Sequence, residues 1–440
     1  MQLPVIDLSA PTGPDQLQSR LRRLRASATG EGEAGATVAQ VIQDVRDRGD
    51  DAVVDYMRRW TDPAFEAHRI RVEPAELRAA RDQLDPALRA ALERAIEHVR
   101  GYQAHIRPRD PAPITLGGAT LGLRHTPFDS AGLAVPGGRA AYPSTVIMLA
   151  GPAQAAGVAS LSVVTPPPTR REGQPPADVA PLVLATCDLM GIDRVYRIGG
   201  AQAIAALALG TARVERVDFI AGPGNTYTQL AKQRLQGHVG IDGFYGPSEI
   251  VTLIDRDADP RRVASDLIAQ AEHDPGHCFL VAWEPGPIDA VNRELQAQTP
   301  RRDRRAAIEA SLRDSSFAVL APDPDHAARV VDAFAAEHVN LAVKDPVHWM
   351  GRLRHAGEYF LGDATPVAAG DYYAGPSHCL PTGTTARFAS GVAVHTFLKR
   401  SGWVHYPSGL PQQAIRDIAA LARAEGLDGH AASVETRAAT

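Results

Sequence analysis

The stretch that decides the fold is RVYRIGGAQAIAALAL, residues 194–209. Its first five residues are typical of a short buried strand, two glycines follow, and residues 201–209 are typical of a buried helix. The same order of strand, glycine-rich turn and helix returns at 217–235. Strands separated by helices of this length predict βαβ units and a parallel sheet.

A second run of the same kind begins at Glu249. It predicts strands at 250–254, 278–282, 317–320 and 339–343, with helices at 261–273 and 325–337. The remaining predictions are a weakly ordered arm at 1–35, helices at 37–60 and 73–107, a Pro-rich surface loop at 166–176, and a helical tail from 388 with an amphipathic helix at 412–424. The tail is too small to fold alone, so we expect it to pack on something else, such as a partner subunit.

The composition is that of a soluble globular protein, with 44% hydrophobic and 22% charged residues in a chain of 440. The net charge of −5 gives no reason to expect nucleic acid or an anionic membrane as a partner. The uncharged stretch 140–169 contains Pro143, Gly151 and Pro152, which favours a short helix and a strand over a membrane span. The absence of a signal-peptide pattern and the small number of cysteines, three, lead us to expect a reducing cytoplasm.

Two strand-to-helix turns, at 198–205 and 221–227, are rich in glycine. Glycines before a helix N-terminus let a phosphate approach backbone N–H groups and the positive end of the helix dipole. Neither turn is GxGxxG, so tight turns that need positive φ are the alternative to a nucleotide site. Two further loops of this kind are Val135-Pro-Gly-Gly138 and Gly246-Pro-Ser248-Glu249.

Gln270 and His273 stand at the end of an amphipathic segment. Gln270 lies on the same side of the helical wheel as Val263 and Leu267, so an amide points where a core residue is expected. His273 follows at i+3, beside Gln270 on the helix surface. Such groups are costly to bury without partners, so a network, a ligand or a metal is expected there.

Three other segments combine an acid with a histidine, at 337–338, 371–378 and 425–430. Glu337 and His338 are predicted to end a helix, with His338 pointing inward. A positioned histidine is a good general base and a neighbouring carboxylate can activate water, whereas the alternative is a hydrogen-bonded core histidine. Zinc prefers N and O donors in a compact shell, and by residue type Glu272 would be chosen before Gln270. Spacing does not show which of these groups converge.

These segments, in this order, resemble the histidinol dehydrogenase family, from about residue 131 to the tail. The motifs that carry the resemblance are Val135-Pro-Gly-Gly, Ile198-Gly-Gly-Ala-Gln-Ala-Ile-Ala, Ala221-Gly-Pro-Gly-Asn-Thr-Tyr, Gly246-Pro-Ser-Glu, Ala269-Gln-Ala-Glu-His-Asp-Pro, Glu337-His338, Gly370-Asp-Tyr and Thr382-Gly-Thr-Thr-Ala-Arg-Phe. Each motif is modest alone, and together they are highly specific.

The resemblance implies an α/β homodimer with two incomplete Rossmann-like parallel-sheet domains, a helical N-terminal arm and a C-terminal helical tail. The implied division is an arm at 1–35, a zinc and substrate domain formed by 36–133 with 248–387, an NAD-binding domain at 134–247, and a tail at 388–440 that reaches the partner subunit. The implied activity is zinc-dependent oxidation of L-histidinol to L-histidine through the aldehyde, with two NAD reduced, as the last steps of histidine biosynthesis.

The resemblance also assigns roles by position. Positions matching zinc ligands are Gln270, His273, Asp371 and His430, and those matching the catalytic acid–base pair are Glu337 and His338. Positions matching substrate contacts are Ser248, His338, Asp371 and Glu425, together with the zinc ligands, and those matching cofactor contacts are Gln202, Asn225 and Ala134. Because the tail ligand comes from the other subunit in this family, the resemblance implies an active site shared between chains.

Four places depart from the family's pattern. Ala134 stands where a tyrosine usually contacts the cofactor, and Tyr245 stands where a small residue is usual. Ser377 replaces an asparagine, and Gly276-His277 is an unusual pair after Asp-Pro. Two alternatives therefore accompany the main reading: a dehydrogenase of another small polar alcohol, and a zinc-binding protein without redox activity.

Overall fold

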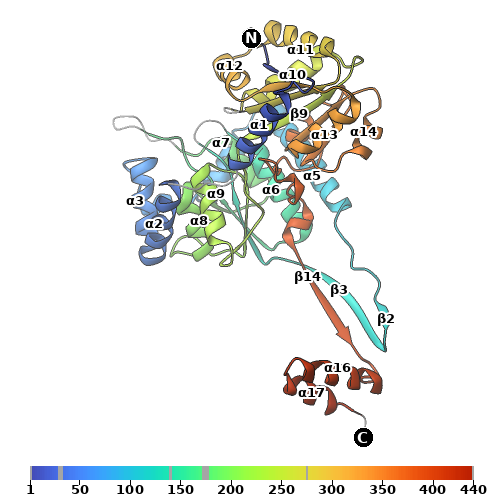
Figure 1. Ribbon diagram of the computed structural model, residues 1–440. Coiled ribbons are helices and arrows are strands. Elements are labelled where there is room, and N and C mark those ends of the chain that lie inside the picture. The colour runs from blue at the N-terminus through green and yellow to red at the C-terminus, as the bar shows by residue number, and fades with distance from the viewer. Residues whose placement is uncertain (1, 28–32, 138–140, 171–177, 274–275, 439–440) are drawn as a thin grey trace.

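The computed structural model describes residues 2–27, 33–137, 141–170, 178–273 and 276–438. Two parallel sheets form the two lobes of a body, and a three-stranded antiparallel sheet leads from it to a pair of helices that stand apart (Figure 1). The predicted α/β class with two parallel sheets is confirmed. Among the described residues, no helix is both long enough and apolar enough to cross a membrane.

The smaller sheet has five parallel strands in the order β6-β5-β4-β7-β8. Their bounds are β4 (Ser130–Ala134), β5 (Ser160–Val164), β6 (Arg194–Tyr196), β7 (Phe219–Ala221) and β8 (Gly240–Ile241). Counted along the chain, this order is 3-2-1-4-5, the doubly wound arrangement in which a ligand binds at the carboxyl ends of the strands beside the first one. Since β4 and β7 are neighbours, the loops that follow them meet at that edge.

Helices cover both faces of the smaller sheet. One core lies under α2 (Glu33–Arg48), α3 (Asp50–Trp60), α8 (Gly200–Leu209) and α9 (Thr226–Leu235), and the other under α4 (Pro74–Asp82), α5 (Pro86–His105), α6 (Pro143–Ala156) and α7 (Pro181–Leu189). The grouping of 36–133 with 248–387 stays a prediction, and the helices of 36–105 pack against the smaller sheet. Val53 of α3 shares a core with Ile204, and Val99 of α5 shares one with Leu149, because the apolar faces of these helices complement the smaller sheet.

The larger sheet has six parallel strands in the order β1-β11-β10-β9-β12-β13. Their bounds are β1 (Val5–Asp7), β9 (Ser248–Ile254), β10 (Gly276–Ala282), β11 (Phe317–Leu320), β12 (His338–Ala342) and β13 (Glu358–Leu361). The N-terminal segment differs from the weakly ordered arm expected there, because Val5 pairs with Ala318 and Ile6 is buried in the core. It forms the edge strand of this lobe.

The larger sheet is also covered on both faces. One core includes α1 (Gly13–Ser27), α13 (Pro324–Phe334) and α14 (Pro346–Arg352), and the other includes α10 (Pro260–Ala271), α11 (Pro285–Gln298) and α12 (Arg305–Asp314), with α15 (Val367–Tyr372) beside α10. The predicted helix end at His338 is wrong. Ala335 has a left-handed backbone (φ 43°), so α13 stops before it and His338 begins β12, paired with Ile250.

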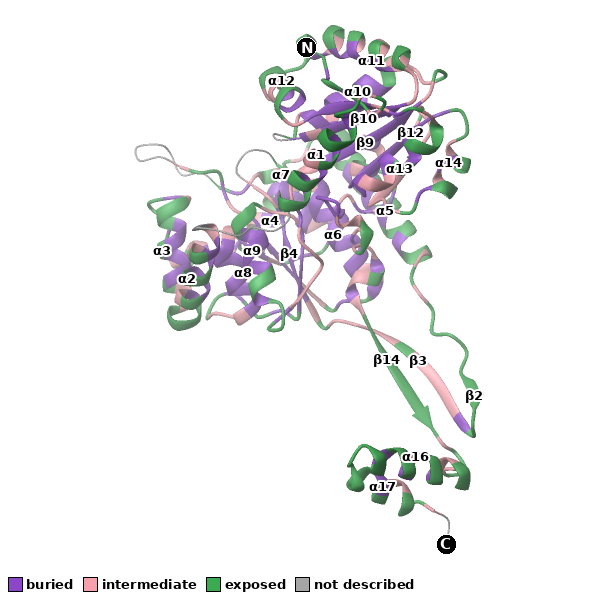
Figure 2. Ribbon diagram, viewed as in Figure 1, coloured by how far each residue is buried: buried purple, intermediate pink, exposed green. Residues whose placement is uncertain are grey.

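A projecting arm, distinct from the N-terminal segment, leaves the body. It consists of β2 (Ile114–Leu116), β3 (Ala119–Pro127) and β14 (Leu398–His405), followed by α16 (Gln412–Ala424) and α17 (Asp428–Glu435). The first part of the predicted helical tail is therefore a strand, since β14 pairs with β3 along its whole length. The helix predicted at 412–424 is present, and Gly426 follows it with a positive φ of 77°. Most of the arm is exposed (Figure 2).

Candidate active site

A cavity of about 700 Å³ lies where the two sheets face each other. The smaller lobe contributes the loops after β4 and β7, including Ala134 and Asn225. The larger lobe contributes the amino ends of β9 and β12, including Ser248, Glu337 and His338. The cavity therefore joins the carboxyl edge of one sheet to the amino edge of the other.

Helices α6, α8 and α9 all begin at the smaller-lobe wall, which contains Thr145, Gly200 and Thr226. Asn225 is the N-cap of α9, and its Oδ1 accepts a hydrogen bond from the backbone N–H of Thr228 at 3.0 Å. Unpaired N–H groups and the positive ends of helix dipoles favour an anion at such a wall. This wall suits a phosphate-bearing ligand.

Gln202 lies one layer beneath this wall. It is buried and does not line the cavity, unlike Ala134 and Asn225. Its Nε2 lies 3.6 Å from Met57 Sδ, and among the described residues its Oε1 has no hydrogen-bond partner. A Cβ on Gly200 would lie 3.0 Å from that Oε1, so only the glycine separates the amide from the wall.

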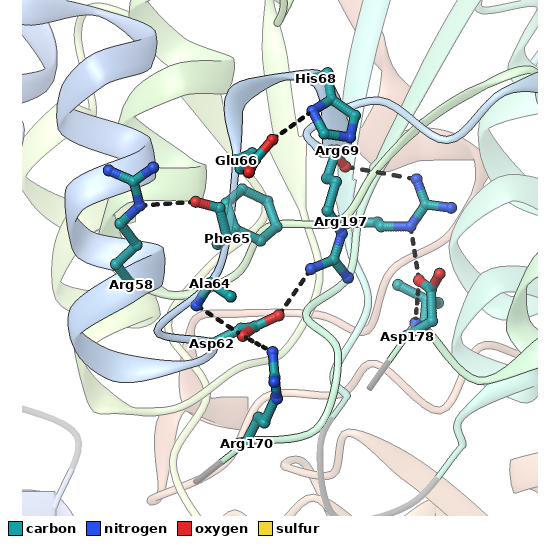
Figure 3. A network of polar contacts seen from close by, with 11 residues as sticks. Arg58, Asp62, Ala64, Phe65, Glu66, His68, Arg69, Arg170, Asp178 and Arg197 are labelled. Atoms are coloured by element: carbon teal, nitrogen blue, oxygen red, sulfur yellow. Dashed lines mark hydrogen bonds and ion pairs between the residues drawn. The ribbon is translucent and has the colours of Figure 1, made fainter. Parts of the chain in front are cut away.

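A polar network surrounds Arg197 and Asp62 (Figure 3). Arg197, directly before the glycine turn, donates from Nε to Asp178 Oδ1 at 2.6 Å and from Nη1 to the Arg71 carbonyl at 3.0 Å. The buried carboxylate of Asp62 accepts from Arg69 at 2.7 Å and from Arg170 at 2.9 Å. The network ties the 62–71 segment to the strand end that leads into the cavity.

On the larger-lobe side, three side chains form a hydrogen-bonded chain. Gln270 Nε2 donates to Ser248 Oγ at 2.8 Å, and Ser248 Oγ donates to Glu337 Oε2 at 2.6 Å. The backbone N–H of Glu249 donates to the same carboxylate oxygen at 2.8 Å. Because the amide nitrogen of Gln270 is engaged, its carbonyl oxygen Oε1 is left for another partner.

The tautomer of His338 follows from its backbone contact. Its Nδ1 lies 3.1 Å from the Glu249 carbonyl oxygen, which can only accept, so Nδ1 carries the proton. Its Nε2 is then the free base, 3.9 Å from Asp371 Oδ1 in the cavity wall. The Glu337 carboxylate lies 3.6 Å from Nδ1 on the other side of the ring.

Burial and neighbouring charge shift the acid–base groups of the site. Burial raises the pKa of Glu337 and, together with Glu337, raises the pKa of Glu249 to about 8. Burial alone would lower the pKa of His338, but the carboxylates of Glu337 and Asp371 outweigh it and raise the pKa. The histidine is thus tuned to accept a proton.

His273 and Asp371 line the cavity beside His338. His273 Nδ1 lies 3.2 Å from the backbone carbonyl oxygen of Gln270, so Nδ1 carries the proton and His273 Nε2 keeps a free lone pair. His378 is fully engaged, because its Nδ1 faces the Asp371 carbonyl at 3.0 Å and its Nε2 faces Thr145 Oγ1 at 3.1 Å. Within the described ranges, no three His, Cys, Asp or Glu side chains gather as a metal site.

Glu425 and His430 are not brought to this cavity. Both are exposed, and they lie on or beside the two helices at the end of the arm, away from the body (Figure 1). The structure therefore brings together Ser248, Gln270, His273, Glu337, His338 and Asp371, and leaves these two tail residues outside.

Several residues of the site were not predicted. Thr145 and Tyr142 stand at the start of α6, and Tyr372 and Thr382 complete the opposite wall. Pro143 at the first helical position was a usable signal for the start of α6. Glu358 does not line the cavity, but it lies opposite His338 on the neighbouring strand β13, and burial raises its pKa to about 7. No local signal points to it.

The departures from the family's pattern differ in their surroundings. Ala134 lines the cavity and is almost fully buried. Tyr245 also lines it, but its hydroxyl donates to Asp242 Oδ2 at 2.8 Å. Ser377 is buried, and its Oγ accepts from the backbone N–H of Cys379 at 3.2 Å. The residues directly before Gly276-His277 lie outside the described part of the chain.

Fold and site together define an α/β protein in which two parallel sheets enclose one polar, acid–base cavity. A family model described as histidinol dehydrogenase matches residues 24–438. A histidinol dehydrogenase of Synechococcus is 43% identical over 403 residues, which are 91% of this chain and 92% of that protein. One of Cupriavidus pinatubonensis is 41% identical over 430 residues, 95% and 94% of the two chains.

A solved structure shows the same architecture. The crystal structure of histidinol dehydrogenase from Elizabethkingia anophelis matches with a TM-score of 0.88 at 28% identity, covering 99% of this chain and 98% of that one. The chain belongs to the histidinol dehydrogenase family.

Proposed function

We propose that this protein oxidises L-histidinol to L-histidine through the aldehyde, with reduction of two NAD, in the last steps of histidine biosynthesis. The observation that carries the proposal is the cavity, which places the free Nε2 of His338 opposite three helix N-termini. A base and an anion-binding wall across one cavity are what hydride transfer from an alcohol to a dinucleotide requires.

The donor set fits zinc. Gln270 Oε1 and His273 Nε2 are the atoms left free by their own hydrogen bonds, and Asp371 adds a carboxylate. His430 would complete the N and O donors that zinc prefers. When bound, zinc would hold the imidazole and amino groups of the substrate and so orient its alcohol carbon. Chelation tests this assignment. It should remove zinc and activity together, and added zinc should restore both.

The smaller-lobe wall fits NAD. A Cβ at Gly137 would lie 2.3 Å from the Pro166 carbonyl oxygen, and one at Gly224 would lie 2.6 Å from Thr228 Cγ2, so side chains are excluded from both places. Both places therefore require glycine, and a cofactor phosphate would lie against the first turns of α8 and α9 at the same wall. Asn225 and the position of Ala134 lie at this wall, and Gln202 would support it from beneath Gly200.

The chain's own groups would move the protons. His338 Nε2 accepts the proton of the alcohol. Its Nδ1–H keeps donating a hydrogen bond to the Glu249 carbonyl oxygen throughout. Glu337, held by Ser248 and the Glu249 N–H, then takes a proton from the water that attacks the aldehyde. Keeping the aldehyde in the cavity between steps prevents the loss of a reactive intermediate.

We propose a homodimer in which Glu425 and His430 serve the partner's cavity. The arm exposes Val404 and Leu421, which are 66% and 67% accessible, and a partner subunit would cover this apolar surface in a dimer. The two terminal helices share only a small core of Ala419, Ala422 and Ala431, which is too little to hold them without further contacts. Light scattering should give twice the mass of one chain.

The deciding experiment measures NADH formed per L-histidinol consumed by zinc-loaded protein, with histidine quantified at the endpoint. Two NADH per histidine are expected. Absence of turnover with zinc bound would favour a dehydrogenase of another small polar alcohol, the candidate that Ala134 motivates, and would call for a screen of such alcohols. Absence of NAD-linked turnover with every alcohol would leave a zinc-binding protein.

A further inference from the structure

We propose that the buried ion pair of Lys232 and Asp242 is a positioning device for the cofactor wall. It would set the affinity for NAD while leaving the chemical step nearly unchanged. The inference rests on the proposed function in one respect, namely that the loop it holds faces NAD. Neither residue lines the cavity, so neither contacts the reacting atoms.

The pair is completely enclosed. Lys232 of α9 and Asp242 after β8 both have side chains with no accessible surface, and Nζ lies 2.5 Å from Asp242 Oδ1. Lys232 Nζ also lies 4.7 Å from the centre of the Tyr245 ring. Replacing a buried ion pair by apolar groups is often neutral or stabilising, so global stability alone is a poor explanation for it.

Both charges converge on a single residue, Gly222. Lys232 Nζ donates to the Gly222 carbonyl at 2.9 Å, and the Gly222 N–H donates to Asp242 Oδ2 at 2.6 Å. Gln229 Nε2 adds a longer contact of 3.4 Å to the same carbonyl. The two peptide groups that flank this residue are thus held by opposite charges, which fixes how the chain turns out of β7.

This turn needs to be fixed because it is confined. Gly222 has a φ of 120°, which other residues rarely adopt, and a Cβ there would lie 2.3 Å from the Ala134 carbonyl oxygen. The next three residues, including Asn225, line the cavity and lead into α9. A rotation at Gly222 would therefore move the 223–225 part of the cofactor wall and the N-terminus of α9.

The same pair reaches the substrate side through Tyr245. The Tyr245 hydroxyl donates to Asp242, and its backbone N–H donates to Gln229 Oε1 at 3.1 Å. Gly246, the next residue, lies two positions before Ser248. Its backbone N–H donates to Thr382 Oγ1 at 2.6 Å. The large residue at this place therefore acts as a buried brace between the two walls.

The test uses a charge-free double variant, Lys232→Met with Asp242→Asn, in the zinc-loaded, full-length protein. Losing one charge alone would leave the other buried and unpaired, which risks unfolding. We expect the Kd and KM for NAD to rise about tenfold or more, which corresponds to about 1.4 kcal/mol. The kcat at saturating NAD and the KM for histidinol should stay within about threefold. Tyr245→Phe keeps the ring and both charges, so it should raise the Kd and KM for NAD by less than the double variant does.

Thr186→Val is the matched control. Thr186 is buried in α7 of the same lobe, and its Oγ1 donates only within that helix, to Leu182. It should leave the Kd for NAD unchanged, whatever its effect on the midpoint of thermal unfolding. If the double variant behaves like this control, with an unchanged Kd, the inference is overturned.

Amide hydrogen exchange of the 222–228 peptide separates this inference from the proposed function. Exchange there should accelerate in the double variant and stay unchanged in Thr186→Val. If the unsubstituted protein neither binds nor reduces NAD but the exchange accelerates, the positioning role stands and the proposed function fails. Unchanged exchange in the double variant overturns the positioning role, whatever the activity.

Discussion

At the residue scale, the active-site geometry depends on how each polar side chain is already engaged. The Glu249 carbonyl assigns the proton of His338 to Nδ1, and the Ser248 hydroxyl assigns the amide orientation of Gln270. Each partner removes one of two possible states and so leaves His338 Nε2 and Gln270 Oε1 free of these bonds.

His338→Asn should lower kcat by about 10² to 10⁴-fold, because it removes the base and keeps a group that can donate to the Glu249 carbonyl. Steady-state kinetics measures the loss, and metal analysis should find zinc at the level of the unsubstituted protein. Zinc lost together with activity would refute the assignment of His338 as a base.

Glu249→Gln should change how stability depends on pH. The pKa of Glu249 is raised from its ordinary 4.5 to about 8 by burial. Between these values the folded chain binds a proton that the unfolded chain has released, so this group makes stability fall as pH rises through the window. The slope is at most about 1.4 kcal/mol per pH unit.

The variant lacks this titration, so its stability relative to the unsubstituted protein should increase from pH 5 to 8 in denaturant unfolding. The control is Glu93→Gln, whose half-exposed carboxylate pairs with Arg89 on the surface of α5. A constant difference between Glu249→Gln and the unsubstituted protein across this range would contradict the raised pKa.

The orientation of single side chains was predictable from the sequence, whereas the hydrogen bonds between them were not. Helix periodicity predicted that Gln270 points inward, and it is buried. Its hydrogen bond to Ser248, and that of Ser248 to Glu337, join a helix, a strand and a loop that lie far apart in the chain. Such contacts are set by tertiary packing, which no local spacing encodes. The assignments of zinc, substrate and cofactor residues stay predictions.

At the element scale, the body of the smaller lobe depends on segments whose partners lie far away in the chain. Helices α2 to α5 carry apolar faces that predict burial, but the sequence does not show that they cover the smaller sheet. Strand β14 was expected to be helical, because its pairing with β3, from Leu398 opposite Pro127 onward, is invisible locally. Strongly alternating βα units were read correctly because their signal is local.

Asp62→Asn should destabilise the smaller lobe by about 1 to 3 kcal/mol, because the amide cannot neutralise both Arg69 and Arg170. The partial exposure of the two arginines keeps the loss at this level. Denaturant unfolding measures it. Asp55→Asn breaks an exposed pair with Arg48 and should stay within about 0.5 kcal/mol. Equal effects of the two variants would show that the network in Figure 3 braces nothing.

At the scale of the whole molecule, the detached position of α16 and α17 is what leads us to propose a shared site (Figure 2). His338→Asn and His430→Asn should each be inactive alone. Mixed in equal amounts and allowed to exchange subunits, they should recover about a quarter of the original activity, because half the dimers are mixed and each of these has one intact cavity. Mass spectrometry confirms the exchange, and its occurrence without any rescue would disprove the sharing.

The position of β1 also has a consequence for synthesis on the ribosome. Val5 leaves the ribosome well before its sheet partner Ala318, which follows about 300 residues later. At about 5–20 residues per second, the first strand waits roughly 15 to 60 s for a neighbour, while the whole smaller lobe is completed in between. A newly made chain therefore carries an unpaired strand edge for most of its translation, and slowing translation within 248–317 should lengthen its dependence on chaperones.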